Sequence, residues 1–334
     1  MKTCKNLAFL AILAGIFALW PMGAGAAVTT MRFSHTFAPD SLEDRCAHSF
    51  SQQVEKQTNG EIKIQIFPAS QIGDTLASFQ GMTLGTLDFH MIDITTTSYL
   101  KGHEEFQVGC VPYLFDSPED ARRIYNSDVY APFYERVRKE KGIRVIAVRG
   151  DRAPRTFNTT KGPIFGLEDC KGIKIRVAPI PVTVKAFEIW GFKPTPINFN
   201  ELFMALKQGV VDGQDNGLDV TVPLKFTEVA KYLAFSNHQY SIYGWFISEK
   251  TWNKASAKYQ GIMEKEAKAA GDLLTKLSGQ REIDDLNTIL KAGAKVTIPN
   301  RVALRETAKD VYKEFEGKVW PAGLVEKIRA MQKR

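Results

Sequence analysis

The sequence predicts an α/β protein of two lobes, each a mixed sheet flanked by helices. A chain of 334 residues exceeds the size at which a single hydrophobic core usually stops growing. Strand and helix patterns alternate from residue 31 onward, which favours a parallel or mixed sheet covered by helices. A charged stretch broken by Gly150 and Pro154 then leads into a second α/β pattern.

The N-terminal residues form a segment of their own. Lys2 and Lys5 precede an apolar run at 7–20, and small residues follow at 23–27. The run is short for a membrane span, and its flanks are those of a secretory signal. We therefore expect residues 1–26 to be a cleavable signal peptide and the protein to be exported to the periplasm.

In the first lobe, apolar and polar residues alternate through 62–66, the period of a strand with one buried face. Asp40 with Glu43 three residues later predicts a capping box at the start of a helix. We expect strands at 31–35, 62–66, 87–92 and 143–148, and helices near 42–58, 75–83 and 129–140, with a further helix that begins at Ser117–Asp120.

The second lobe is organised around residues 170–216. We expect a strand at 172–177, helices at 182–190 and 201–208, a short buried strand at 210–211 and a polar turn at 213–216. In this arrangement a strand end, an extended segment and a turn bring Arg176, Phe199 and Asn216 towards one rim. Ligands of such sheets lie beyond the carboxyl ends of the strands.

The chain is expected to cross between the lobes more than once. The first crossing falls at 149–155, a return falls near 239–243, and the helical tract 254–292 is long enough to lie across both lobes. Lobe I then comprises 27–150 with 241–280, and lobe II comprises 151–240 with 281–334.

Composition argues against several functions. The net charge of +7 falls to +5 without Lys2 and Lys5, and the remaining cations are scattered, which excludes a nucleic-acid footprint. Cys46, Cys110 and Cys170 imply no disulfide framework, although a pair among them stays open. The chain has no common hydrolase, P-loop or dinucleotide motif, and we expect His103 and its acidic neighbours to be solvated surface rather than a metal site.

Several strings resemble a known family. They are GIKIRV at 172–177, PINFNELFMALKQGVVDGQDN at 196–216, TNGEIKIQIFPASQIGD at 58–74, VPYLFDS at 111–117 and KYLAFSNHQY at 231–240. Together they resemble the periplasmic solute-binding subunits of TRAP transporters, the dicarboxylate-binding DctP-type family. The resemblance implies a two-lobed periplasmic binding protein (flytrap) with a long helix across both lobes. It also implies a monomeric receptor, without catalytic residues, cofactor or metal, that delivers a small organic acid to TRAP membrane subunits.

The resemblance assigns roles in the second lobe. Arg176 falls where the family's carboxylate-clamping arginine lies, and a guanidinium can hold a carboxylate at two points. Arg155 falls where a second arginine approaches the same carboxylate, with Arg152 as a near competitor. Phe199 would form an apolar wall and Asn216 would hydrogen-bond the ligand.

In the first lobe, His35 and Thr36 end the first strand, where the family often contributes a polar contact. Asp93 follows the third strand, and a carboxylate there suggests a ligand with a hydroxyl or ammonium at that end. A structural role for Asp93 as a cap is an equal alternative. Trp245 could stack on a ligand or pack the hinge.

Other functions stay open at this point. The protein could serve a sensor kinase instead of a transporter, or it could be a periplasmic hydrolase or lyase with Asp93 as base. The chain departs from the family pattern at Ala178 and Gly217, where proline is common.

Overall fold

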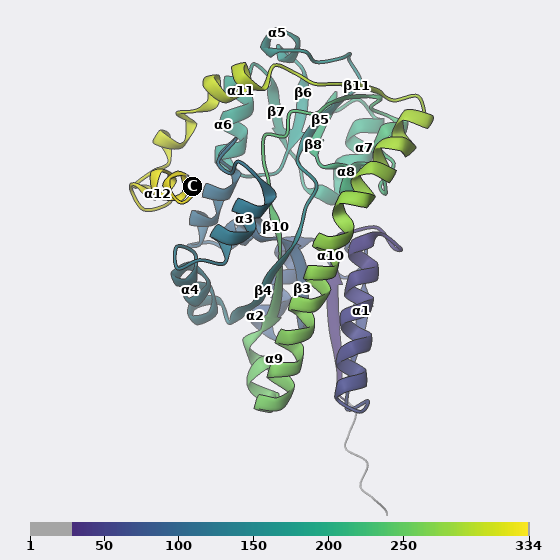
Figure 1. The fold of residues 1–334 in the computed structure, drawn as a ribbon, viewed down its shortest axis with the longest axis vertical. Helices are drawn as coiled ribbons and strands as arrows, with labels where there is room; N and C mark the ends of the chain where they lie inside the picture. The colour runs from purple at the N-terminus through teal and green to yellow at the C-terminus, as the bar shows by residue number, and fades with distance from the viewer. Residues whose placement is uncertain (1–28, 333–334) are drawn as a thin grey trace, which may run out of the picture.

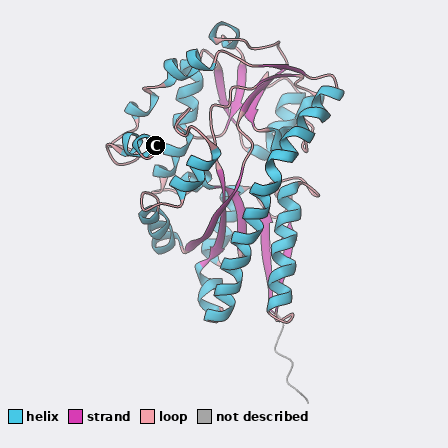
Figure 2. Cartoon of the chain, viewed as in Figure 1, coloured by secondary structure: helices cyan, strands magenta, loops and turns pink. Residues whose placement is uncertain are grey.

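A computed structural model describes residues 29–332. The chain forms two sheets with helices packed around them (Figures 1 and 2). The first sheet has the order β2-β1-β3-β10-β4 and the second β11-β9-β5-β8-β6-β7. The strands of the first sheet are β1 (Thr29–His35), β2 (Ile62–Phe67), β3 (Phe89–Asp93), β4 (Ile143–Asp151) and β10 (Ile242–Ser248). Those of the second sheet are β5 (Thr156–Thr159), β6 (Lys174–Val177), β7 (Lys193–Pro196), β8 (Gly213–Asn216), β9 (Tyr232–Ala234) and β11 (Lys295–Thr297).

Both sheets are mixed, which confirms the predicted fold class. In the first, β1 runs parallel to β2 and β3, whereas β10 is antiparallel to β3 and β4. In the second, β6 is parallel to β7 and β8, and β5 is antiparallel to β8 and β9. The helices are α1 (Leu42–Gln57), α2 (Thr75–Leu84), α3 (Pro118–Tyr125), α4 (Ala131–Lys141), α5 (Leu167–Cys170), α6 (Pro181–Ile189), α7 (Leu202–Lys207), α8 (Leu218–Thr221), α9 (Glu249–Lys254), α10 (Ala257–Lys291), α11 (Arg301–Ala308) and α12 (Leu324–Ala330).

The chain passes between the sheets where β4 leads into β5 and again where β9 leads into β10. The helix α10, 35 residues long, runs past β4 and α1 and reaches α8 at the second sheet (Figure 1). Near the C-terminus, Gln332 donates to the carbonyl of Leu114 at 2.8 Å and so holds the end of the chain beside the segment before α3. Within 29–332, no helix is long and apolar enough to cross a membrane.

Two local predictions were wrong, each for a physical reason. The cap of α1 is Ser41, whose hydroxyl accepts from the Asp44 amide, and Asp40 lies before it with a positive φ of 63°. Val210 is 50% exposed, and the strand begins later, at Gly213. The polar residues expected to form a turn are therefore a central strand, β8, between β5 and β6.

Strand β8 can be buried because its polar side chains have partners inside the protein. The Gln214 amide nitrogen lies 3.2 Å from Asn158 Oδ1 on β5 and 3.1 Å from Thr221 Oγ1 on α8. The Asn216 amide donates in turn to Gln214 Oε1 at 2.5 Å. Buried polar groups are tolerated when they are hydrogen-bonded in this way.

The two sheets are also joined by buried charges. The hydroxyl oxygen of Tyr243 on β10 lies 2.9 Å from Glu43 on α1 and 3.0 Å from Asp219 on α8. Arg281 on α10 pairs with the same Glu43, whose side chain is fully buried. Asp285, one turn further along α10, lies 3.7 Å from Arg281. Four elements from both halves of the molecule therefore share one ionic cluster.

The helix α10 approaches β4 closely because Gly271 has no side chain. A Cβ at Gly271 would lie 2.3 Å from the Arg149 Cβ and 2.9 Å from its carbonyl carbon. Gly279 lies on the same helix, and a Cβ there would meet nothing within 4 Å.

We predict that Gly271→Ala lowers the free energy of unfolding by about 1–2 kcal/mol, because the steric clash outweighs the better helix propensity of alanine. Gly279→Ala, the matched control, should raise it by up to about 1 kcal/mol. Urea denaturation followed by circular dichroism measures both. Equal stabilisation by the two substitutions would contradict the close packing of α10 on β4.

A second prediction concerns pH. Burial, with the nearby carboxylates of Asp219 and Glu43, raises the pKa of Asp285 to about 7 although Arg281 opposes the shift. The pKa of an aspartate in the unfolded chain is about 4. Between these values the folded protein binds the extra proton, so this group makes stability fall as pH rises from about 4 to 7.

The melting temperature of Asp285→Asn should therefore equal that of the wild type near pH 4. Above pH 4 the variant should melt at the higher temperature, and the difference should grow up to pH 8. Asp128→Asn, which removes an exposed carboxylate that does not contribute to the Asp285 shift, is the control and should show no such trend. Thermal unfolding of the three proteins across this pH range is the measurement. A difference that stays constant with pH would refute the assignment.

Candidate functional site

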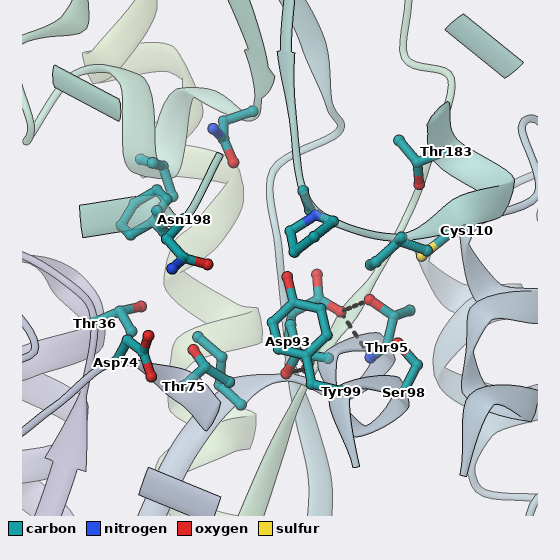
Figure 3. A pocket seen from close by; sticks show the side chains of 18 of the residues that line it. Thr36, Asp74, Thr75, Asp93, Thr95, Ser98, Tyr99, Cys110, Thr183 and Asn198 are labelled. Atoms are coloured by element: carbon teal, nitrogen blue, oxygen red, sulfur yellow. Dashed lines mark hydrogen bonds between the residues drawn. The ribbon is translucent and has the colours of Figure 1, made fainter. Parts of the chain in front are cut away.

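A cavity of about 390 Å³ lies where strand ends of the two sheets meet. Its wall comes from the segments that follow β1 and β3 of the first sheet, from the ends of β6 and β8 of the second, and from the crossing segment between β4 and β5. Ligands of α/β sheets commonly bind beyond strand ends. Figure 3 shows hydroxyl, amide and carboxyl groups directed into this space.

Arg176 stands near the end of β6 and is 3% exposed. Its Nε donates to the Ile197 carbonyl at 2.8 Å, and its guanidinium carbon lies 5.8 Å from the centre of the Phe199 ring. Within residues 29–332 no carboxylate oxygen lies within 4 Å of the Arg176 guanidinium nitrogens. Burial lowers its pKa to about 10, still far above neutral pH. The cavity wall therefore holds a charged guanidinium that is without a counter-ion in the described chain.

Arg155 lines the same cavity but is paired. Its Nε donates to Asp215 Oδ2 at 2.8 Å. The Nε2 of His238 lies 3.5 Å from the same oxygen, and its Nδ1 lies 2.8 Å from Ser236 Oγ. Burial raises the pKa of Asp215, but Arg155 and His238 together outweigh burial and lower that pKa to about 2. Arg155 is thus a fixed, neutralised donor.

Arg152, the near competitor, binds two carboxylates. Its Nη1 donates to Asp93 Oδ2 at 2.8 Å and its Nε to Asp219 Oδ2 at 3.2 Å. Asp93 Oδ1 also accepts from Ser241 Oγ at 2.7 Å and from the amide and hydroxyl of Thr95 at 2.9 and 2.7 Å. Asp93 therefore caps the 3₁₀ helix Ile94–Tyr99 and faces the cavity as well.

The structure brings together six of the residues predicted for the site. They are Arg176, Arg155, Asn216, Phe199, Asp93 and Thr36, all of which line the cavity. His35 and Trp245 lie outside it. The His35 ring is buried, with Nε2 3.0 Å from Asp44 Oδ1, and Nδ1 accepts from the Phe37 amide. Trp245 is 1% exposed in the aromatic core of the first sheet and donates to the Arg149 carbonyl.

Further wall residues were not singled out from the sequence. Tyr99 and Ser98 follow Asp93 in a polar run, and their position after a strand was the available signal. Thr36, Asp74 and Thr75 lie together on one side of the cavity, with Asn198 above them (Figure 3). Asp74 ends one of the family strings and directly precedes the helix expected at 75–83, so the available signal was that of a helix cap rather than a cavity contact.

Two other expectations can be compared with the structure, and of the residues concerned Cys110 lines the cavity. His103 and Glu105 are buried rather than solvated, and Glu105 pairs with Arg136. Cys46, Cys110 and Cys170 are free and buried. No group of three potential metal ligands occurs among residues 29–332.

Comparison with known proteins gives a consistent result. Residues 33–318 match the family model DctP, described as bacterial extracellular solute-binding protein, family 7. The sialic acid-binding periplasmic protein SiaP of Vibrio cholerae is 29% identical over 305 residues, covering 91% of this chain and 94% of that protein. The C4-dicarboxylate-binding periplasmic protein DctP of Rhodobacter capsulatus is 25% identical over 293 residues, 86% of this chain and 87% of that protein.

Solved structures agree. The sugar acid binding protein of Advenella mimigardefordensis in complex with galactonate has a TM-score of 0.87 at 25% identity, covering 92% of this chain and 98% of that one. A TRAP periplasmic solute binding protein from Ochrobacterium anthropi with bound L-fuconate has a TM-score of 0.85 at 27% identity, covering 92% and 100%. The chain therefore belongs to the DctP family of TRAP periplasmic solute-binding proteins.

Proposed function

We propose that this protein is a periplasmic receptor that captures a small organic carboxylate between its lobes and delivers it to TRAP membrane subunits. The lobes would be 27–150 with 241–280 and 151–240 with 281–334. Support comes from the cavity, whose wall draws on both sheets, and from relatives named for acid ligands.

The observation that carries the proposal is the state of Arg176. Removing a guanidinium from water is costly unless an anion compensates it. A ligand carboxylate would supply that missing charge and could accept two parallel hydrogen bonds from the planar fork. A bound carboxylate would therefore offset the desolvation cost of the Arg176 guanidinium.

The other wall residues have complementary roles. Arg155, held by Asp215, would donate to the same carboxylate without itself requiring a counter-ion. Asn216 would add a neutral hydrogen bond, and Phe199 would pack on the carbon chain. Thr36 and Asp93 would face the opposite end of the ligand. We assign His35 and Trp245 a supporting role behind the cavity wall. His35 acts through its contact with Asp44, and Trp245 acts through its packing in the core of the first sheet.

Relatives in this family are binding proteins, which favours a receptor over an enzyme. Asp93 is a poor candidate for the base of a hydrolase or lyase, because Arg152, Ser241 and Thr95 already donate to its oxygens. We further propose that the receptor is monomeric and exported. The signal peptide expected at 1–26 lies outside the described residues.

A ligand screen tests the receptor function. Carboxylates, sugar acids and amino acids are added to the purified protein, and its melting temperature is followed. A true ligand binds the folded state alone and stabilises it by RT ln(1 + [L]/Kd). A shift with at least one acid is expected, and its absence across the panel would contradict the proposal. Chemical conversion of the stabilising acid, seen by chromatography, would favour an enzyme instead.

Substitution of Arg176 tests the clamp. Arg176→Lys keeps the charge but loses the two-point fork, and one charge-assisted hydrogen bond contributes about 1.5–3 kcal/mol. We therefore predict roughly 10- to 100-fold weaker binding. Arg176→Ala should weaken it further while leaving stability unchanged or slightly higher, since an unpaired buried cation disappears.

Lys174→Ala is the matched control for these titrations. Lys174 lies on the same strand two residues earlier, is exposed, and donates to the Gly209 carbonyl outside the cavity. Calorimetric titration with the acid found in the screen should show little change. If Arg176→Lys binds the acid with wild-type affinity while Lys174→Ala binds it more weakly, Arg176 is not the residue that holds the carboxylate.

A further inference from the structure

Resting on the proposed function, we infer that the ligand carries a single carboxylate on a hydroxylated chain, and that Asp93 and Asp74 exclude acids with a second carboxylate. The inference follows from how charge is distributed around the cavity. It separates sugar acids with one carboxylate from dicarboxylates, both of which occur among the ligands named for relatives.

Within residues 29–332, the cations of the cavity wall offer one free charge. Arg155 is neutralised by Asp215, and Arg152 is shared by Asp93 and Asp219. Arg176 alone among these three arginines is without a carboxylate within 4 Å in the described chain. A dicarboxylate would need a second uncompensated cation, and neither paired arginine is free to serve.

The Asp93 side of the cavity is negative rather than neutral. Arg152 and Arg281 contribute two positive charges against the three carboxylates of Asp93, Asp219 and Glu43. Asp93 is 3% exposed, its Oδ1 accepts three hydrogen bonds, and its Oδ2 accepts one from Arg152. Oδ2 can accept another from a ligand hydroxyl, whereas a ligand carboxylate there would meet a buried like charge.

Asp74 adds a second negative charge at the cavity edge. Its Oδ1 accepts from the Ala77 amide at 2.8 Å and so caps α2. It lies beside Thr36 and Thr75, away from Thr183 (Figure 3). Other wall residues are neutral groups that both donate and accept hydrogen bonds, including Thr95, Ser98 and Asn198. Such a wall suits hydroxyl groups and gives a second carboxylate no cation.

Matched acids test the inference. D-Galactonate and galactarate differ at one terminal carbon, which is a hydroxymethyl group in the first and a carboxylate in the second; D-gluconate and D-glucarate form another such pair. The full mature protein is titrated calorimetrically with both pairs, the corresponding hexuronates, N-acetylneuraminate, succinate and malate. This panel contains both monocarboxylates and dicarboxylates. We expect the tightest ligand to be a hydroxylated monocarboxylate, with its diacid partner at least about 100-fold weaker, as for like charges brought together in a desolvated site.

Asp74→Asn refines the test. Asparagine caps a helix as well as aspartate does, so the fold of α2 is retained while the charge is lost. The affinity of the diacid relative to its monoacid should rise by roughly 2- to 5-fold, the scale of a partly solvated charge interaction. Asp128→Asn, which removes an exposed carboxylate outside the cavity wall, is the control and should leave the ratio unchanged.

The outcomes separate the two proposals. A diacid that binds as tightly as its monoacid, or succinate or malate as the tightest ligand, overturns this inference and leaves the carboxylate receptor intact. An unchanged ratio in Asp74→Asn overturns the role of Asp74. Failure of every carboxylate in the panel overturns the receptor itself, and the inference with it.

Discussion

The rest of the site depends on one buried guanidinium. Arg176 is carried into the cavity wall by β6, a strand held between β7 and β8. The Ile197 carbonyl and the face of Phe199 fix the orientation of its guanidinium group. The fold, rather than a counter-ion, therefore sets the direction of the remaining N–H donors. Because desolvating a cation is costly, the second lobe must be stable enough to hold it there. The aromatic cluster of Phe157, Phe187 and Trp190 supplies apolar burial behind it.

The three arginines of the cavity illustrate how partners decide function. Arg152 is committed to Asp93 and Asp219 and so belongs to the ionic cluster that joins the two sheets. Arg155 is fixed by Asp215, with His238 and Ser236 behind it. Arg176 has no such partner among residues 29–332. Identical side chains therefore serve as a structural tie, an oriented donor and a free charge, according to the carboxylates that the fold places beside each.

The same ionic cluster bears on how the halves of the molecule are coupled. Tyr243, Glu43, Asp219 and Arg281 come from β10, α1, α8 and α10, and they are buried or nearly so. Arg152 links this cluster to Asp93 at the cavity wall. Any relative movement of the sheets must preserve or rearrange these pairs, since a buried charge left without its partner is costly. One network of paired charges therefore connects the cavity wall to the contact between the two halves.

The sequence by itself determined the α/β class, the mixed sheets, the long helix, the family and most of the strands, because hydrophobic periodicity and turn residues are local properties. It also indicated six of the residues that line the cavity. Only the tertiary structure decided that residues 213–216 form a buried central strand, because partners for Gln214 come from β5 and α8. Likewise, only the fold shows that His35 and Trp245 face the core while Thr36 faces the cavity. Which arginine stays unpaired depends on Asp93, Asp215 and Asp219, which approach from distant parts of the chain and cannot be assigned to partners by local pattern.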